Sequence, residues 1–310
     1  MKIVFFGTPA FAVPFLKQLH DDPSIEVVAV VCQPDKPAGR SQEPSIPAVK
    51  TFALEKSIPV LQFETLRDAS AVETLKSLQA DAFVLVVYGK ILPQDVLDIA
   101  PLGVVNVHPS MLPKYRGPSP MKTAILNGER ETGISIMLLD SGMDSGPVLA
   151  QKPVTIDARE TNESLEQKMC DVGPFFLVET LKAYVREDLK PVPQDDSRAT
   201  ISKLLSRDDG HIDWSKTAVE IDRQLRAFDP WPGCWTLWNE RRLKILSASV
   251  VTGPSSHDDP GTVFKNENDI LVTTSTEFIR LTQVQLEGKQ PQSIEEFVNG
   301  HPDFITSRLT

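Results

Sequence analysis

Cysteine is scarce in this chain, and its thiols do not suggest a disulfide framework. The three cysteines, Cys32, Cys170 and Cys234, are far apart and odd in number. A small secreted domain held by disulfides would show an even set of cysteines at short spacings. We therefore expect free or buried thiols in a reducing compartment, and we predict a cytoplasmic protein.

Long apolar runs are also lacking. No stretch reaches the about 20 apolar residues that a membrane-spanning helix requires. The opening segment is partly apolar, but Gly7, Pro9 and Pro14 interrupt it, and it lacks a cleavage-like end. A first strand explains this segment better than a signal peptide does. We predict no membrane association.

Net positive charge is absent. The chain carries 32 Lys or Arg against 42 Asp or Glu, a formal net charge of −10. Residues 201–310 hold 12 basic and 16 acidic residues, a balance of −4. A surface that is basic all over is therefore excluded, although nucleic-acid affinity depends on where Lys and Arg cluster. The five histidines show no metal-ligand spacing, so no metal is expected.

The dinucleotide fingerprint is missing as well. Gly7 follows the first apolar run, where a G-x-G-x-x-G motif would begin, but the two later glycine positions hold Pro9 and Ala12. That motif needs glycines where the backbone approaches a pyrophosphate. A tight turn between strand and helix explains Gly7-Thr8-Pro9 better, which disfavours a nicotinamide-dependent oxidoreductase.

What the chain does contain is an alternation of strands and helices. Its length corresponds to about two domains of roughly 150 residues each. Apolar runs rich in β-branched residues predict buried strands, and apolar residues three or four apart predict helices. The predicted strands are Lys2–Phe6, Ile25–Val31, Ala82–Val87, Gly103–Val107 and Ile134–Leu139, and the predicted helices are Phe11–Leu19, Ala71–Leu78 and Leu165–Val185. This order predicts an α/β fold with a Rossmann-like, doubly wound, mostly parallel sheet.

The residue composition of the sequence changes after Tyr184. A polar stretch with Pro191 and Pro193 predicts a linker. We predict a catalytic domain over residues 1–188, a linker over 189–205 and a small β domain over 206–310. In this last part a helix precedes short strand-like runs, which are Trp235–Trp238, Leu243–Val251, Gly261–Phe264, Ile270–Thr274 and Phe278–Val284. An antiparallel barrel or sandwich is the natural interpretation.

Three polar residues follow or end apolar strands. Asn106 and His108 are two apart at the end of one strand, so an extended backbone places both side chains on one face. Asp144 lies in a glycine-containing loop after the next strand. Ligands of open α/β sheets bind outside the carboxyl ends of the strands. We expect an amide donor, an imidazole and a carboxylate to meet at one edge of the sheet, where Asp144 orients His108 and favours its charged form.

The stretch Asn106-Val-His-Pro-Ser-Met-Leu-Pro-Lys-Tyr-Arg-Gly117 resembles the signature of 10-formyltetrahydrofolate-dependent formyltransferases. The resemblance implies a formyltransferase fold whose catalytic residues are Asn106, His108 and Asp144. It also implies that 10-formyltetrahydrofolate is the formyl donor. The implied folate-binding residues are Ser110, Met111, Leu112 and Pro113, together with Tyr88, Ile91 and Leu92 of a loop lining the pterin pocket.

Three further stretches are similar to those members of the family that formylate charged initiator tRNA. They are Val4–Ala12, Gln33–Arg40, and Ile212–Ser215 with Arg226–Gly233. The resemblance implies that initiator Met-tRNA is the acceptor, that the C-terminal domain is an OB-like β-barrel that helps to hold tRNA, and that Arg40 contacts tRNA. The chain departs from the family where Ser41-Gln-Glu-Pro44 replaces further basic residues. The other available basic residues are Lys114, Arg116, Arg223, Arg241, Arg242 and Lys244.

The implied reaction places an amine on the formyl carbon, and negative charge develops on the formyl oxygen. The Asn106 amide and a protonated His108 suit that oxygen as donors. We expect Asp144 to raise the pKa of His108 by its opposite charge and to relay protons through water. The chain is predicted to act as a monomer. The alternatives are transfer to an amino sugar nucleotide or other small amine, hydrolysis of the formyl-folate, and a non-catalytic RNA-binding module.

Overall fold

The computed structural model describes residues 1–38, 43–252 and 259–310, and these residues form two compact units. The first unit comprises residues 1–120, 131–155 and 166–202. The second comprises residues 121–130, 156–165 and 203–310. Among the described residues, no helix is both long and apolar enough to cross a membrane.

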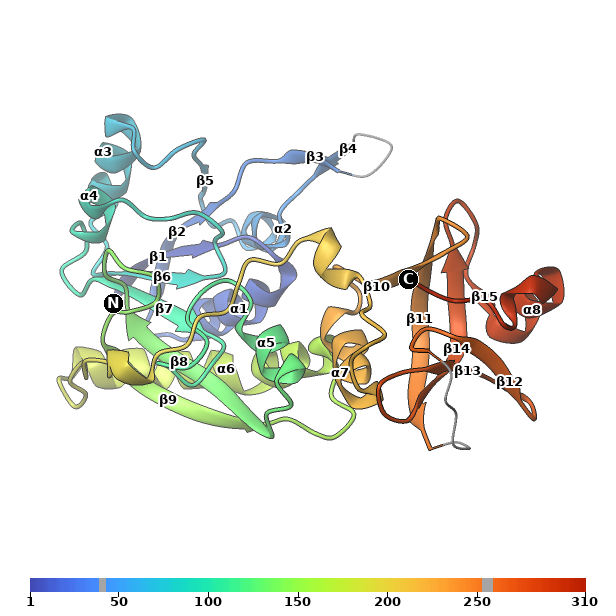
Figure 1. Cartoon of the computed structure of the whole chain (residues 1–310). Coiled ribbons are helices and arrows are strands. Elements are labelled where there is room, and N and C mark those ends of the chain that lie inside the picture. Colours follow the sequence, from blue (N-terminus) through green and yellow to red (C-terminus); the bar gives the residue numbers. More distant parts are fainter. Residues whose placement is uncertain (39–42, 253–258) are drawn as a thin grey trace. The chain divides into compact units, whose positions relative to one another are not determined.

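The first unit is built on a seven-stranded sheet in the order β5-β2-β1-β6-β7-β8-β9 (Figure 1). Its strands are β1 (Lys2–Gly7), β2 (Glu26–Cys32), β5 (Val60–Gln62), β6 (Ala82–Val86), β7 (Val104–His108), β8 (Glu131–Leu138) and β9 (Val148–Thr155). The strands from β5 to β7 are parallel, whereas β8 and β9 run antiparallel to their neighbours. The predicted Rossmann-like, mostly parallel sheet is confirmed.

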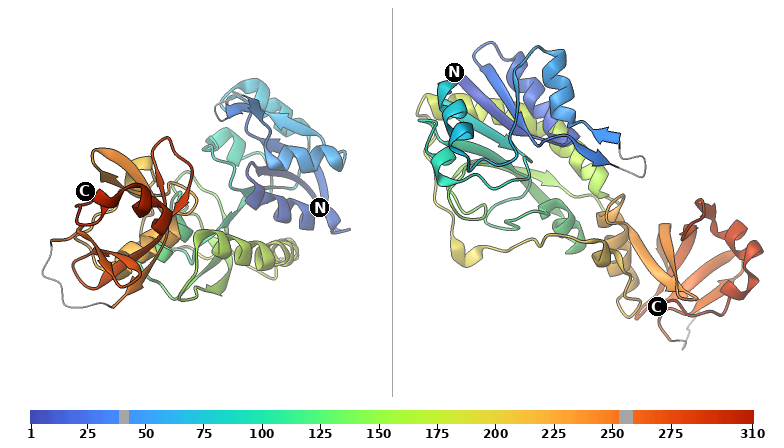
Figure 2. Two further views of the ribbon diagram at one scale, coloured as in Figure 1. Left: turned by 90° about the vertical axis from the view of Figure 1, so that its right-hand side faces the viewer. Right: turned by 90° about the horizontal axis from the view of Figure 1, so that it is seen from above.

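Helices lie on both faces of this sheet (Figure 2). They are α1 (Val13–Asp21), α2 (Ala48–Glu55), α3 (Ala69–Ser77), α4 (Gln94–Leu97) and α6 (Asn162–Val185), and a short α5 (Pro120–Leu126) follows β7. Alternation along β1 sends Phe6 to one face, where it joins a core with residues of α3 and α4. Gly173 of α6 permits close packing against α1, because a Cβ atom there would lie 2.6 Å from the ring of Phe15. The two apolar layers enclose the sheet.

The elements missed from the sequence are short or weakly patterned. They include the helices α2, α4, α5 and α8 (Ile294–Gly300), the strands β5, β9 and β15 (Gln292–Ser293), and a small hairpin of β3 (Lys36–Ala38) and β4 (Glu43–Ser45). β9 escaped detection because Gln151, Lys152 and Pro153 interrupt its apolar pattern. An edge strand tolerates such residues, since only one of its sides pairs with a neighbour.

The second unit contains a separate antiparallel sheet, as predicted. Its order is β10-β11-β14-β13-β12, and β15 pairs with β14. The strands are β10 (Cys234–Trp238), β11 (Arg241–Val251), β12 (Val263–Asn266), β13 (Asp269–Thr273), β14 (Phe278–Leu286) and β15 (Gln292–Ser293). Its two main helices are α7 (Ala218–Phe228) and α8 (Ile294–Gly300), and each begins with a capping box, at Thr217 and at Ser293.

An aromatic cluster forms part of the core of the second unit. Phe297 of α8 is fully buried and lies edge-on to Trp238 and to Phe304, with ring centroids 5.4 and 5.1 Å apart. Edge-to-face aromatic pairs add to the burial of apolar area. All four tryptophans of the chain, Trp214, Trp231, Trp235 and Trp238, belong to this unit. Tryptophan fluorescence therefore reports on the second unit alone.

We predict that Phe297→Ala lowers the free energy of unfolding of the second unit by about 3–5 kcal/mol, because it leaves a cavity among buried rings. Urea titration followed by tryptophan fluorescence measures this loss. Phe175→Ala is the control, since Phe175 lies exposed on α6 in the first unit. An unchanged fluorescence midpoint in Phe297→Ala would show that the aromatic cluster does not stabilise this unit.

Candidate active site

Two of the three predicted catalytic residues lie on β7. This strand pairs in parallel with β6 and antiparallel with β8, and every one of its residues is buried. Asn106 is 5% exposed and His108 is 4% exposed. The valines that alternate with them keep the strand extended, so both side chains leave the same face, as expected.

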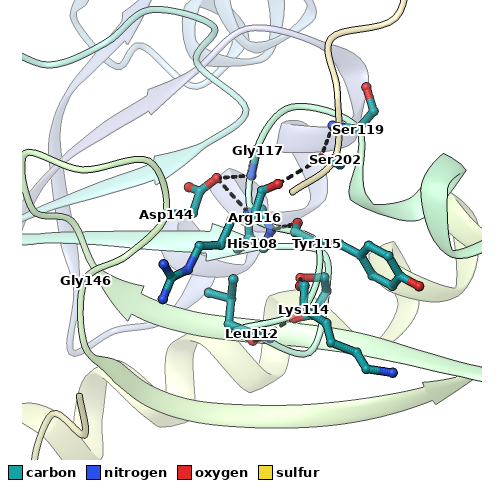
Figure 3. A network of polar contacts seen from close by, with 12 residues as sticks. His108, Leu112, Lys114, Tyr115, Arg116, Gly117, Ser119, Asp144, Gly146 and Ser202 are labelled. Carbon is teal, nitrogen blue, oxygen red and sulfur yellow. Dashed lines mark hydrogen bonds and ion pairs between the residues drawn. The ribbon is translucent and has the colours of Figure 1, made fainter. Parts of the chain in front are cut away.

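The His108 imidazole lies between two oxygen atoms (Figure 3). Its Nε2 is 2.9 Å from the backbone carbonyl oxygen of Tyr115. Its Nδ1 is 3.6 Å from Oδ2 of Asp144. A carbonyl oxygen only accepts hydrogen bonds, so Nε2 carries a proton and donates a hydrogen bond to the Tyr115 carbonyl oxygen. In the neutral ring, Nδ1 then carries no proton, and its lone pair faces the Asp144 carboxylate.

The protonation state of His108 differs from the expected one. Burial of the ring lowers the pKa of His108 below its ordinary value of 6.5, although the charge of Asp144 and the Tyr115 carbonyl both favour the charged form. The expected charged form rested only on the attraction of the Asp144 carboxylate. The free-energy cost of removing the charged ring from water is the larger effect. We therefore take His108 as a neutral imidazole at pH 7, held ready to accept a proton.

Asp144 reaches His108 by a different route from the one predicted. The expectation was that both residues lie at carboxyl ends along one sheet edge. That reasoning is wrong, because β8 is antiparallel to β7, and Leu138 at its end pairs with Val105 near the start of β7. The five residues of β7 span roughly 13 Å. The loop after β8 must run back along β7 to bring Asp144 beside His108.

Local backbone geometry aims the Asp144 carboxylate. Asp144 adopts a positive φ of 49°, which is uncommon for a residue other than glycine. Its Oδ2 accepts a hydrogen bond of 2.8 Å from the backbone N–H of Gly117. Gly117 itself has φ of 101°, and a Cβ atom there would lie 2.7 Å from the carbonyl oxygen of Ser202. Only glycine fits that turn, so Gly117 supplies a donor that the sequence reasoning did not assign.

Residues 192–202, which we call the strap, pack against the loop that follows β7. The expected linker here is held by several hydrogen bonds rather than running free. The backbone N–H of Arg116 donates to the carbonyl oxygen of Thr200 at 2.9 Å, and that of Ser202 donates to the carbonyl oxygen of Arg116 at 2.7 Å. Ser202 is only 1% exposed. A polar composition was therefore a poor guide, because these polar groups pair with backbone of the loop.

The predicted folate-binding segment after His108 is mostly turned inward. Ser110 is fully buried, and its hydroxyl donates to the carbonyl oxygen of Lys114 at 2.6 Å. Leu112 is buried as well, and its N–H donates to the hydroxyl of Ser135 at 3.1 Å. Met111 and Pro113 are half-buried. Ser110 and Leu112 thus fix the shape of the loop, and the assignment of all four residues to folate stays a prediction.

The loop after β6 places its three predicted residues in different surroundings. Tyr88 is buried in the core against Phe6, and burial raises the pKa of its phenol to about 12. Leu92 is also buried, whereas Ile91 is 90% exposed. The ring of Tyr88 is therefore occupied in packing, Ile91 is open to solvent, and the assignment of the three residues to the pterin pocket stays a prediction.

The structure describes only some of the basic residues named from the sequence. Arg40, the predicted tRNA contact, lies outside the described residues. Arg116 is not a solvated surface cation, because it is 7% exposed and its guanidinium bonds to Gln194 and Asp196 at 3.0 and 2.7 Å. Within the described residues, no group of three or more His, Cys, Asp or Glu side chains is arranged to hold a metal ion.

Comparison with protein families and solved structures agrees with this architecture. The formyl transferase family model matches residues 1–181, and the formyl transferase C-terminal domain model matches residues 204–302. HypX from Aquifex aeolicus, solved in complex with tetrahydrofolic acid, is similar in fold with a TM-score of 0.63 and 17% identity, covering 96% of this chain and 47% of that chain. An N-formyltransferase from Helicobacter canadensis, solved with folinic acid and dTDP-3-aminofucose, has a TM-score of 0.63 and 20% identity, covering 91% and 98%.

The sequence relatives are much closer than these structures. The chain is 48% identical over 300 residues to the methionyl-tRNA formyltransferase of Roseiflexus sp. (strain RS-1), covering 97% of this chain and 92% of that protein. At that identity over nearly the full length of both proteins, with both formyl transferase parts matched, the chain belongs to the methionyl-tRNA formyltransferase family.

Proposed function

We propose that the protein transfers a formyl group from 10-formyltetrahydrofolate to the α-amino group of methionine on charged initiator tRNA. The observation that carries the proposal is the His108–Asp144 pair, with Asn106 two residues before His108 on the same buried strand, in a chain of this family. We assign these three residues as the catalytic set. One chain supplies all three, so we further propose a monomer, working in the cytoplasm where charged initiator tRNA is used.

The acceptor amine suits a site without a strong base. A free α-amino group has a pKa of about 7.7–8.0, and esterification of the neighbouring carboxyl lowers it further. Much of the amine is therefore neutral near pH 7 and attacks the formyl carbon directly. A new C–N bond forms, and the electron pair of the C=O bond moves onto the formyl oxygen. The site must stabilise that oxyanion and move one proton.

Asn106 is suited to donate a hydrogen bond to the oxyanion. Within the described parts of the chain, no hydrogen bond engages its side-chain amide, and the residue as a whole is 5% exposed. Its amide atoms are not among the polar atoms sealed from solvent without a partner, so they can bond to water in the free protein and to the formyl oxygen in the complex. A preorganised donor in such surroundings contributes strongly when charge develops on the oxygen that it faces.

His108 and Asp144 are suited to accept the proton of the amine and to return it. Attack leaves a positive charge on the amine nitrogen, and the neutral imidazole with its carboxylate partner, a pair of charge −1, takes up that proton at the facing atoms Nδ1 and Oδ2. The resulting imidazolium would donate to both of its oxygen neighbours. The pair then returns the proton to N10 of the folate as the C–N10 bond breaks, and both residues recover their starting state. Asp144 is the more accessible partner, with 19% of its side chain exposed.

The loop after β6 offers apolar side chains that suit the flat face of an aromatic ring system on the donor side. Ile91 and Val87 are exposed apolar side chains of that loop. Val87 also has a positive φ of 47°, an outlier for a β-branched residue that the surrounding structure must hold. We propose that this loop covers the pterin of 10-formyltetrahydrofolate. Ser110 to Pro113 would shape the opposite wall through the buried hydrogen bonds of Ser110 and Leu112.

We propose that residues 206–310 form the tRNA-holding domain, joined by residues 189–205 to a catalytic domain of residues 1–188. Its sheet carries a cationic side chain on an aromatic ring, Arg242, whose guanidinium lies 3.8 Å from the centre of the Trp235 ring. Such pairs present a flat, charged surface of a kind that binds nucleic acid. Arg40 is proposed as a further contact to tRNA from the first domain.

We expect the purified protein to formylate initiator Met-tRNA with 10-formyltetrahydrofolate as donor. The assay follows labelled formyl-methionyl-tRNA, with a dTDP-linked amino sugar and buffer alone as parallel acceptors. Turnover on Met-tRNA alone would support the proposal. Formylation of the amino sugar but not of tRNA would assign a sugar substrate to the same residues, and release of formate without acceptor would identify a hydrolase.

We expect Asn106→Ala to reduce kcat by about 10²–10³, because one donor to the oxyanion is lost. The KM for the folate donor should change little, since the interaction forms mainly in the transition state. Asn299→Ala is the matched control, because Asn299 is exposed on α8. Full activity of Asn106→Ala would remove Asn106 from the catalytic set.

A further inference from the structure

Both oxygen partners of His108 belong to residues with strained backbone. Tyr115, which supplies the carbonyl, has φ of 59°, and Asp144, which supplies the carboxylate, has φ of 49°. Residues other than glycine persist in this region only where their surroundings hold them. The geometry around His108 therefore depends on whatever fixes these two residues.

The strap contacts both of them. Thr200 accepts a hydrogen bond of 2.8 Å from the backbone N–H of Tyr115 through its hydroxyl, and its own N–H donates to the carbonyl oxygen of Pro113 at 3.2 Å. Ser202 closes the same loop further along, where its hydroxyl accepts from the N–H of Ser119 at 3.0 Å (Figure 3). The loop after β7 is thus bonded to the strap on both sides of Arg116.

Gln194 of the strap bonds to the Asp144 loop itself. Its Nε2 donates to the carbonyl oxygens of Asp144 and Gly146, at 2.8 and 2.7 Å. Its Oε1 accepts from Nε of Arg116 at 3.0 Å, and Arg116 in turn forms an ion pair with Asp196. One amide group therefore joins the loop after β8 to the loop after β7.

Within the described residues, and apart from the contacts of the Asp144 carboxylate with Gly117 and His108, the other hydrogen bonds of this loop do not act on Asp144 directly. The N–H of Leu138 donates to the carbonyl oxygen of Pro147 at the base of the loop, at 2.9 Å. The hydroxyl of Ser145 donates to the Asp140 carboxylate within the loop, at 2.9 Å. Gln194 bonds to the main chain at Asp144, so it restrains the residue whose side chain faces the imidazole.

We propose that Gln194 is a positioning residue that acts through Asp144. By holding the Asp144 carbonyl and the Arg116 guanidinium together, Gln194 keeps the Asp144 carboxylate against His108 and the Gly117 N–H. It touches neither substrate nor reacting atoms in this account. The inference rests on the proposed function only in that Asp144 is assigned to formyl transfer.

The test is a double-mutant cycle between Gln194→Met and Asp144→Asn. Methionine has a similar length but neither donates nor accepts as the amide does. Gln194→Met should lower kcat by about 10- to 100-fold, because a displaced catalytic group loses its alignment. In the Asp144→Asn background the same change should cost almost nothing further, since the carboxylate it positions is already gone. Equal losses in the two backgrounds would overturn the proposal.

Two matched variants separate positioning from a loss of folding. Gln167→Met removes an amide that donates to Asp171 on the exposed side of α6, and it should leave kcat unchanged. Gln194→Glu keeps an acceptor for Arg116 but places a carboxylate oxygen against the two carbonyl oxygens. It should lose as much activity as Gln194→Met. Full activity in Gln194→Glu would show that only the Arg116 bond matters, which contradicts the proposal.

Hydrogen exchange gives a readout that does not require the proposed reaction. The Gly117 N–H donates to the Asp144 carboxylate, so it should exchange at least about 10-fold faster in Gln194→Met, while amides of β7 keep their rates. An unchanged Gly117 rate would overturn the positioning role even if formyl transfer is observed. Failure of the parent protein to formylate Met-tRNA, with faster Gly117 exchange in the variant, would overturn the proposed function alone.

Discussion

A buried imidazole with oxygen atoms on both sides is the constraint around which this site is organised. The Tyr115 carbonyl fixes the proton of His108 on Nε2, and the bare Nδ1 faces the Asp144 carboxylate. Burial keeps the ring neutral, while both oxygen atoms stabilise the charged ring that forms when a proton arrives. The same surroundings therefore keep the resting ring neutral and supply two hydrogen-bond acceptors for the imidazolium when it forms.

This constraint explains features of the chain that are otherwise unconnected. The loop after β8 runs back along β7 because an antiparallel strand ends at the wrong edge of the sheet. Gly117 adopts a backbone conformation with positive φ, which glycine alone adopts easily, and its N–H thereby reaches Asp144. The strap holds both loops by hydrogen bonds, through Thr200 to the loop after β7 and through Gln194 to the loop after β8. Strain at Tyr115 and Asp144 is offset by these bonds.

The sequence predicted those features that periodicity and motif control. Valines alternating with Asn106 and His108 placed both residues on one face of a strand, and apolar runs located most of the central strands. The antiparallel direction of β8 could not be predicted, because alternation of strands and helices favours parallel pairing. The hydrogen bonds of the strap, which lies within the predicted linker, could not be predicted because bonds to backbone leave no apolar signal. Roles of carbonyl and amide groups, as at Tyr115 and Gly117, are invisible in residue types.

The protonation and tautomer of His108 test the account most directly. Nitrogen-15 NMR of the protein labelled in its histidines distinguishes a proton on Nε2 from one on Nδ1, and a His108→Gln variant assigns the signal. We expect the neutral Nε2–H form at pH 7, with titration below pH 6.5, and a still lower pKa in Asp144→Asn because an attractive charge is removed. A charged ring at pH 7, or a proton on Nδ1 in the neutral ring, would contradict the central claim.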